Sequence, residues 1–264
     1  MSLSRIFSGV AAAVLGLAVT AGAAEAKVYK VGVTQGPHEQ VVEFVKSELA
    51  KKGIEIEVIG FSDYVLPNQA LNDGDLDINS FQHQPYLDNQ IKDRGYKLTS
   101  VGKSIVLPMG IYSNKVKALK DFKKGDTIGL PNDPTNGGRA LLLMQTAGLI
   151  KVDPKAGLRA GPADVIDNPK GLKFVELDAA QLPRAIPDLV GAAVNTNYAI
   201  QAGLVPTKDA LIVEDANSPY ANVIAVQTQN KDADWVKAFV AAYHSDATKK
   251  FIVETFKGSI VPAF

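Results

Sequence analysis

The sequence predicts an α/β chain built mainly on parallel strands. Two observations predict this class: short apolar runs with strand-like alternation recur along the chain, and segments with helical periodicity separate them. A third observation concerns stability. The 264 residues include no cysteine, so the fold must depend on a buried core rather than on disulfides. No internal repeat, low-complexity tract or flexible linker interrupts the pattern, which indicates that any two lobes share strands rather than a tether.

The first elements are the clearest. Tyr29–Thr34 is expected to be a strand that ends before Gly36-Pro37. A helix should follow, because residues 41, 45 and 49 are apolar and fall on one face, and Gly53 is placed to end it. Further strands are expected at residues 54–61, 76–79, 105–112, 127–130, 172–177, 192–195, 211–214 and 223–227, with helices between them and helical segments over about 233–256.

Residues 1–26 predict a cleavable signal peptide. Arg5 gives a positive start, Ile6–Ala21 is an almost uninterrupted apolar run, and Ala24-Glu25-Ala26 has the small-x-small form that signal peptidase cuts. The apolar run is shorter than the ~20 residues that a membrane-spanning helix needs. We therefore expect an exported protein.

Composition and motifs exclude several classes of function. With 28 basic and 28 acidic residues, the net charge is zero and gives no electrostatic reason to expect binding to nucleic acid or to an anionic membrane surface. There is neither a Gly-x-Ser-x-Gly nucleophile motif nor a phosphate-binding loop. The three histidines, His38, His83 and His244, match no common zinc spacing, although distant residues can converge in a fold. We expect no catalysis, no metal and no cofactor.

The segment Asn132–Arg139 is the first candidate site. It leaves a strand through a Gly-rich turn, and Thr135 or Asn136 is expected to cap a helix that begins near Gly138. A helix N-terminus attracts anions, and Arg139 in its first turn is unfavourable unless an anion neutralises it. A guanidinium group suits a carboxylate bidentately. The alternative is a surface arginine paired with Asp133.

Two further clusters are candidates. Phe81, His83 and Tyr86 follow a short strand and are joined by Tyr64 upstream, so loops at strand ends can form an aromatic slot. The alternative is that these rings are core residues. Two asparagines, Asn195 and Asn222, lie at the edges of apolar strands, where an amide oxygen can accept a hydrogen bond from an ammonium group or the residue can simply form a turn.

Together these segments resemble the methionine-binding lipoproteins of the NlpA/MetQ type, which are receptors of bacterial methionine importers. Several matches in the same order are more specific than any single motif, and they span essentially the whole chain after the signal peptide. The matching segments are Val31–His38, Phe61–Asn68, Phe81–Leu87, Asn132–Asn136, Gly138–Leu143, Ala193–Ala199 and Ser218–Asn222.

The resemblance implies a type II periplasmic-binding-protein fold, with two α/β lobes joined by two crossing strands and a ligand cleft between them. Residues 27–108 and 221–264 would form lobe 1 and residues 109–220 lobe 2, with crossings at Pro108-Met109-Gly110 and Asn222–Gln227. By matching positions, Arg139 would hold the ligand carboxylate, Asn195 and Asn222 would take the ammonium group, and Asn136 would support the arginine loop. Tyr64, Phe81, His83 and Tyr86 would surround the rest of the ligand, and Asn197 is expected to be structural.

The implied protein is a monomeric periplasmic receptor that closes around methionine, foremost L-methionine, and delivers it to an ABC permease and its ATPase. The alternatives are D-methionine, a methionine-containing dipeptide or another apolar amino acid as ligand, a metal receptor that uses the histidines, and an enzyme of the same fold acting on a small amino acid. One departure from the family matters: the cysteine for lipid attachment is missing. We therefore expect a freely diffusing receptor of a Gram-negative cell.

Overall fold

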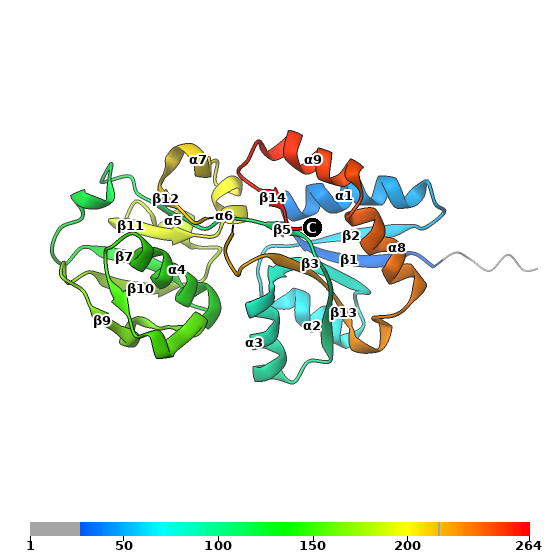
Figure 1. The fold of residues 1–264 in the computed structure, drawn as a ribbon, viewed down its shortest axis with the longest axis horizontal. Helices are drawn as coiled ribbons and strands as arrows, with labels where there is room; N and C mark the ends of the chain where they lie inside the picture. Colours follow the sequence, from blue (N-terminus) through cyan, green and yellow to red (C-terminus); the bar gives the residue numbers. More distant parts are fainter. Residues whose placement is uncertain (1–26, 216) are drawn as a thin grey trace, which may run out of the picture.

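The computed structural model describes residues 27–215 and 217–264 as two α/β lobes that lie side by side (Figure 1). Each lobe is built on a five-stranded sheet, with strand orders β2-β1-β3-β13-β4 and β10-β7-β11-β6-β12. The predicted two-lobed α/β fold is confirmed. The predicted signal peptide, residues 1–26, lies outside the described residues.

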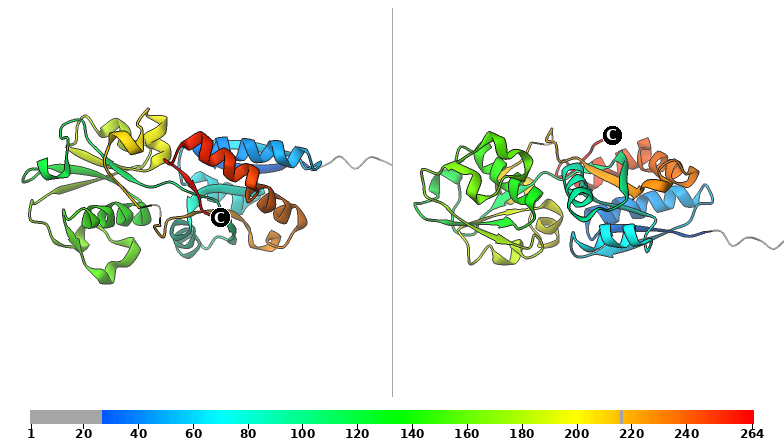
Figure 2. Two further views of the ribbon diagram at one scale, coloured as in Figure 1. Left: turned by 45° about the horizontal axis from the view of Figure 1, so that its top comes forward. Right: turned by 90° about the horizontal axis from the view of Figure 1, so that it is seen from below.

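The first lobe carries helices on both faces of its sheet, as the three views agree (Figure 2). Helices α1, α8 and α9 pack together on one face, and α2 and α3 cover the other. Its strands are β1 (Tyr29–Thr34), β2 (Ile56–Phe61), β3 (Ile78–His83), β4 (Leu98–Lys103) and β13 (Asn222–Gln227). Its helices are α1 (Pro37–Ala50), α2 (Leu66–Asp73), α3 (Gln84–Arg94), α8 (Asp234–Tyr243), α9 (Asp246–Phe256) and the 3-10 helix η4 (Thr228–Asn230).

The second lobe repeats this layered design on a smaller scale. Helix α4 packs on one face of its sheet, and α5 and α6 pack on the other. Its sheet contains β6 (Gly110–Tyr112), β7 (Thr127–Pro131), β10 (Lys173–Leu177), β11 (Gly191–Val194) and β12 (Ala210–Val213). Around it lie α4 (Pro134–Thr146), α5 (Leu182–Ala185), α6 (Thr196–Gln201), α7 (Pro206–Asp209), the 3-10 helices η1 (Leu119–Asp121), η2 (Pro154–Arg159) and η3 (Pro162–Asp164), and the strand pair β8 (Lys151–Val152) and β9 (Val165–Asp167).

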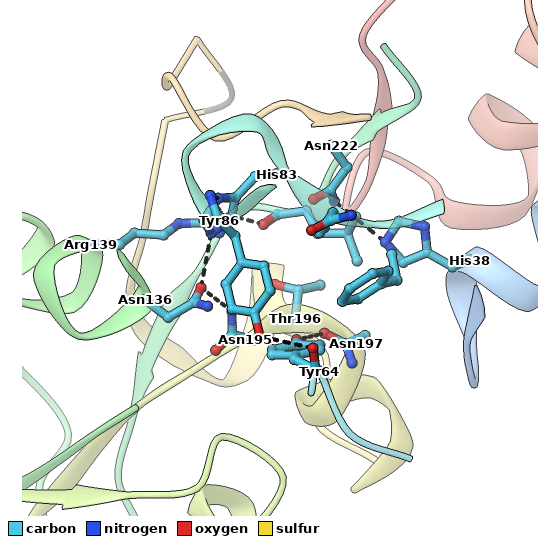
Figure 3. A pocket seen from close by; sticks show the side chains of 13 residues that line it. His38, Tyr64, His83, Tyr86, Asn136, Arg139, Asn195, Thr196, Asn197 and Asn222 are labelled. Atoms are coloured by element: carbon cyan, nitrogen blue, oxygen red, sulfur yellow. Dashed lines mark hydrogen bonds between the residues drawn. The ribbon is translucent and has the colours of Figure 1, made fainter. Parts of the chain in front are cut away.

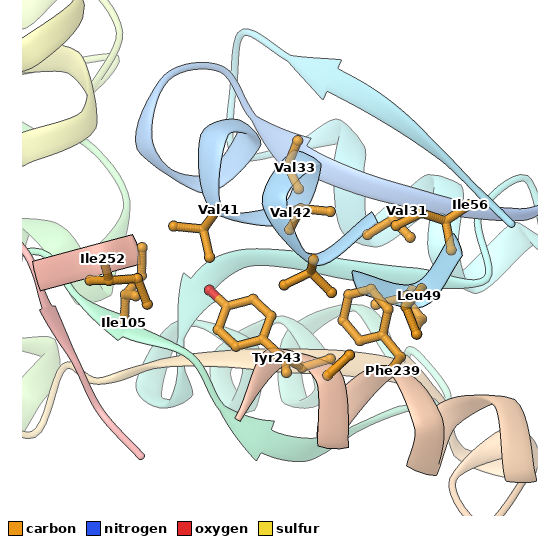
Figure 4. Packing of buried hydrophobic residues seen from close by; sticks show 14 of the residues in the cluster. Val31, Val33, Val41, Val42, Leu49, Ile56, Ile105, Phe239, Tyr243 and Ile252 are labelled. Carbon is orange, nitrogen blue, oxygen red and sulfur yellow. The ribbon is translucent and has the colours of Figure 1, made fainter. Parts of the chain in front are cut away.

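The largest core lies between the first sheet and its helices (Figure 4). Alternate side chains of β1, Val31 and Val33, meet the apolar face that the sequence predicts for α1, including Val41 and Leu49. Phe239 of α8 closes this core from the C-terminal part of the chain. Because α8 follows the second lobe in sequence, the first lobe is completed only after the chain has returned to it.

The two crossings lie beside each other. The first is residues 107–109, between the short strand β5 (Ile105–Val106) and β6, which agrees with the predicted Pro108-Met109-Gly110 interruption. The second lies between β12 and β13. The expectation that Asn222–Gln227 is itself a crossing is wrong, because β13 pairs with β3 and β4 inside the first sheet. The C-terminal strand β14 (Val261–Pro262) pairs with β5 near the junction.

The expectation of mainly parallel strands is only partly correct. Pairs β1–β2, β1–β3, β10–β7 and β11–β7 are parallel, but β13 is antiparallel to β3 and β4, and β6 to β11 and β12. The antiparallel direction of β13 follows from the topology. It enters the first sheet from the other lobe, at the edge where β3 ends, so it must run in the opposite direction.

Strand β3 is longer than predicted and contains residues that we expected in a loop. Ser80 and Gln82 break the apolar alternation, yet both are buried. The Gln82 amide exchanges hydrogen bonds with Asn68 at 2.6 and 2.7 Å, and Asn79 donates to the same Asn68 oxygen at 2.9 Å. Because this amide cluster satisfies its own polar groups, a polar sequence can form a buried strand. Phe81 and His83 therefore project from a strand.

Candidate ligand-binding site

A cavity with about 340 Å³ of empty space lies between the lobes (Figure 3). All eight residues singled out from the sequence line it: Tyr64, Phe81, His83, Tyr86, Asn136, Arg139, Asn195 and Asn222. Five other residues line the cavity for which the sequence indicated no ligand contact, namely His38, Gln82, Leu107, Thr196 and Asn197.

Strand ends of both sheets place these side chains. His83 ends β3 and lies beside Asn222, the first residue of β13. Asn195 directly follows β11, and α4, which carries Asn136 and Arg139, follows β7. The cavity therefore lies at the carboxyl ends of parallel strands in both lobes, where open α/β sheets bind their ligands.

Arg139 reaches the cavity in a different way from the one predicted. Helix α4 begins at Pro134, and the Asp133 carboxylate caps it by accepting from the backbone N–H groups of Thr135 and Asn136. The predicted cap at Thr135 or Asn136 is therefore wrong, and Arg139 lies in the second turn. The alternative, pairing with Asp133, is also wrong, since the carboxylate that binds Arg139 belongs to Glu214.

The Arg139–Glu214 pair is buried, with the arginine side chain only 4% exposed. Nε of Arg139 lies 3.2 and 3.1 Å from the two Glu214 oxygens, and Nη2 donates to Glu214 and, at 2.8 Å, to the Leu107 carbonyl. The guanidinium also lies 4.5 Å above the Tyr220 ring. Within the described residues Nη1 has no hydrogen-bond partner, so it is the nitrogen left for a ligand.

A chain of amide contacts fixes the orientation of Asn195. The Asn136 amide nitrogen donates to Asp133 at 2.9 Å, so the Asn136 oxygen must face the other way. That oxygen accepts from the Asn195 amide nitrogen at 2.8 Å. The Asn195 oxygen is consequently a buried acceptor, and it has no partner in the part of the chain that the structure describes. A buried acceptor of this kind calls for a donor from outside the protein.

His83 connects this amide chain to the first lobe. Its Nδ1 accepts from the Tyr86 backbone N–H at 3.1 Å, so in the neutral ring Nε2 carries the proton and donates to the Asn136 oxygen at 3.2 Å. Burial, together with the neighbouring Arg139 guanidinium, lowers the pKa of His83 to about 3. The ring is therefore neutral at physiological pH and acts as a fixed hydrogen-bond donor across the lobes.

Aromatic rings of the first lobe form the cavity wall that faces Arg139 and Asn195. The Tyr64 ring lies 6.1 Å from Phe81 and 6.2 Å from Tyr86, and the Tyr86 hydroxyl donates to the Tyr64 carbonyl at 2.8 Å. Burial raises the pKa of the Tyr64 hydroxyl well above its usual range, so it remains a donor, and it reaches the Asn197 oxygen at 2.5 Å. Asn197, expected to be structural, thus lies on the cavity wall and ties the lobes together.

His38 and Asn222 form a pair on the first-lobe side. The Asn222 amide nitrogen lies 3.4 Å from Nε2 of His38, at the start of α1. Burial lowers the pKa of His38 to about 3, so this ring is also neutral. Figure 3 shows the two side chains next to each other on one side of the cavity. His38 had stood out in the sequence only as one of three scattered histidines.

Contacts between the lobes surround the cavity. Besides the Tyr64–Asn197 and His83–Asn136 bonds, Gln201 donates to the Gln35 carbonyl at 2.7 Å. The Tyr198 hydroxyl donates to the Ser62 carbonyl at 3.2 Å, and Arg159 pairs with Asp93 at 3.3 Å. The described conformation is therefore a closed one.

The described residues contain neither a metal-binding cluster nor a membrane-spanning helix. No group of three or more His, Cys, Asp or Glu side chains is arranged to hold a metal ion among residues 27–215 and 217–264. In the same part of the chain, no helix is both long and apolar enough to cross a bilayer.

Two α/β lobes that close over a cavity at their strand ends define a binding protein with the type II periplasmic-binding-protein fold. The chain belongs to the NlpA lipoprotein family, whose model matches residues 29–264. It is 52% identical over 235 residues to the D-methionine-binding lipoprotein MetQ of Yersinia pestis, covering 88% of this chain and 87% of that protein. The corresponding MetQ of Escherichia coli K12 is 50% identical over the same coverage.

Solved structures show the same likeness. A nutrient-binding protein from Burkholderia cenocepacia bound to methionine is 52% identical, with a TM-score of 0.87 over 90% of this chain and all of that one. The crystal structure of the methionine-binding protein MetQ is 49% identical, with a TM-score of 0.86 over 89% of this chain and 98% of that one.

Proposed function

We propose that this chain is the periplasmic solute-binding protein of an ABC importer and that it binds methionine, foremost L-methionine, between its lobes. The observation that carries the proposal is a single cavity that offers a guanidinium nitrogen and an unpaired amide oxygen on one lobe and an aromatic wall on the other. The names of the relatives support it, since they describe methionine-binding proteins.

The proposed roles follow from the groups left without protein partners. Nη1 of Arg139 would donate to the ligand carboxylate, and the Asn195 oxygen would accept from the ammonium group together with Asn222. Asn136 would hold Asn195 in place. The rings of Tyr64, Phe81, His83 and Tyr86 would pack against the side chain, where a thioether gains ~0.3–1.5 kcal/mol per aromatic contact.

Binding from both lobes supports a hinge mechanism. An open form would admit the ligand, and contacts from residues 27–108 and 221–264 on one side and 109–220 on the other would stabilise the closed form. We infer that the monomeric closed form is what the ABC permease and its ATPase recognise. The relatives are named lipoproteins, whereas this sequence has no cysteine, so we propose that the receptor acts in the periplasm without a thiol-linked lipid.

Native mass spectrometry of protein purified without added ligand tests the proposal, followed by calorimetry with L-methionine, D-methionine and a methionine dipeptide. We expect L-methionine to bind tightest and to be released unchanged, as befits a receptor rather than an enzyme, and chelators to have no effect. D-methionine is the second candidate because of the names of the relatives. No heat of binding with any of these ligands would refute the proposed function.

Asn222→Ala is the sharper variant for this test. Loss of a hydrogen bond to a charged group is worth ~1.5–3 kcal/mol, so methionine should bind about 10- to 150-fold more weakly. Asn89→Ala, at a buried asparagine of α3 that does not line the cavity, is the control. Arg139→Ala is less informative, because it strands the buried Glu214 carboxylate, and removing one partner of a buried pair typically destabilises the fold by ~3–5 kcal/mol.

A further inference from the structure

The carboxylate of Glu214 occupies the face of Arg139 that a ligand would be expected to use. Nε and Nη2 supply three N–H groups, and these point at Glu214 and the Leu107 carbonyl. A ligand carboxylate is left with the two N–H groups of Nη1. The bidentate contact that the sequence suggests between Arg139 and a ligand is thus made inside the protein.

Both crossings between the lobes hold this pair. Glu214 directly follows β12, its backbone N–H donates to the Met109 carbonyl at 2.8 Å, and its side chain accepts from the Met109 N–H at 3.3 Å. Leu107, whose carbonyl accepts from Arg139, belongs to the other side of the same crossing. The guanidinium is therefore positioned by the hinge as well as by helix α4.

We propose that Glu214 is a positioning residue that makes the cavity selective for zwitterions over simple carboxylates; this inference rests on the proposed function. Glu214 neutralises Arg139, so the buried pair adds no net charge to the site. A carboxylate ligand must then bring its own positive charge or leave an uncompensated anion in that site. Asp133, which also lies near the aromatic wall, adds to the penalty for an anion.

A purely structural role for Glu214 would have a different effect on the two ligand affinities. If it only packed the hinge, its loss would weaken all ligands by the same factor. If it balances the charge of Arg139, its loss must favour the anion relative to the zwitterion, because Arg139 becomes an uncompensated cation. The ratio of two affinities therefore separates these roles, even when both affinities fall.

The test compares methionine with 4-(methylsulfanyl)butanoate, which is methionine without its ammonium group. Calorimetry gives the two affinities, and thermal shift with millimolar ligand detects the weaker one. In Glu214→Gln we expect the preference for methionine to fall at least about tenfold relative to wild type. We also expect 4-(methylsulfanyl)butanoate to raise the melting temperature of this variant more than that of wild type.

Two further variants complete the design. Glu214→Asp keeps the charge but withdraws the carboxylate, so both affinities should fall about tenfold with the wild-type ratio retained; this variant decides the matter if Glu214→Gln does not fold. Asp93→Asn removes the acidic partner of Arg159 in the exposed interlobe pair and should leave the ratio unchanged.

The proposal is overturned if Glu214→Gln weakens both ligands equally, or if Glu214→Asp binds methionine as wild type does. Wild-type protein that binds no methionine would instead refute the proposed function and the inference that rests on it. The failure of the Glu214 proposal can be distinguished from the failure of the proposed function, because the first can be observed only when the wild-type protein binds methionine.

Discussion

Removal of the Tyr64 hydroxyl should lower the stability of the closed form relative to the open form without disturbing the fold of either lobe. The Tyr64 hydroxyl donates to the Asn197 oxygen across the cleft at 2.5 Å. Asn197 is 4% exposed, and its amide nitrogen has no partner among the described residues. In Tyr64→Phe the whole amide is unpaired when the lobes close, whereas water can hydrate it when they are open. Because the ring remains against Phe81 and Tyr86, packing is retained.

The magnitude follows from the cost of a buried unpaired polar group, ~1–3 kcal/mol, which corresponds to a methionine Kd raised about 5- to 150-fold. Calorimetry measures this change, and the melting temperature of the unliganded protein should stay within about 2 °C. Tyr112→Phe is the matched control, because Tyr112 is a buried tyrosine of β6 whose hydroxyl has no described partner. A change below about twofold in Tyr64→Phe, or an equal loss in Tyr112→Phe, would refute the reasoning.

Two other expectations concern stability. Burial lowers the pKa of His38 and His83 to about 3, below the ~6.5 of an unfolded chain, so between those values the unfolded state binds more protons and stability falls as the pH is lowered. From pH 7 to pH 5 the loss should be on the order of 2–4 kcal/mol by denaturant titration, and a flat profile would contradict it. In Gly138→Ala the new Cβ would lie 2.5 Å from the Leu158 carbonyl, so we expect a loss of ~1–3 kcal/mol and weaker ligand binding through the adjacent Arg139. Gly161→Ala, where the nearest atom is 3.9 Å away, is the control, and equal melting temperatures for the two variants would count against the argument.

Regular alternation made the first strand and helix predictable. β1 has the bounds that the sequence predicts, and the predicted apolar face of α1 is buried. Strand β4, Leu98–Lys103, was missed because its polar and glycine residues do not form an alternating apolar pattern. Its place in the sheet depends on pairing with β13, which comes more than a hundred residues later. Local pattern cannot report a partner that is distant in sequence.

The residues of the candidate site also fall into two groups, those that the sequence pattern indicated and those that it did not. Residues in recognisable segments, such as Arg139 and Asn195, were singled out, whereas Glu214 and His38 were given no role in binding the proposed ligand. Glu214 did carry a signal: like Asn195 and His83, it is a polar residue at the end of a strand. A carboxylate in that position gave no indication of which cation it meets, because α4 is brought to it only by the folding of the second lobe.

The mixed direction of the strands explains how two asparagines from distant segments meet at one cavity. Asn195 follows the carboxyl end of β11, as expected for a parallel α/β sheet. Asn222 instead begins β13, and it reaches the same place only because β13 runs antiparallel to β3, with Asn222 opposite His83. If β13 were parallel to β3, its first residue would lie at the far edge of the sheet, about five residues or ~17 Å away. The crossing from the second lobe therefore does more than connect the lobes: it determines the strand direction that brings Asn222 to the cavity.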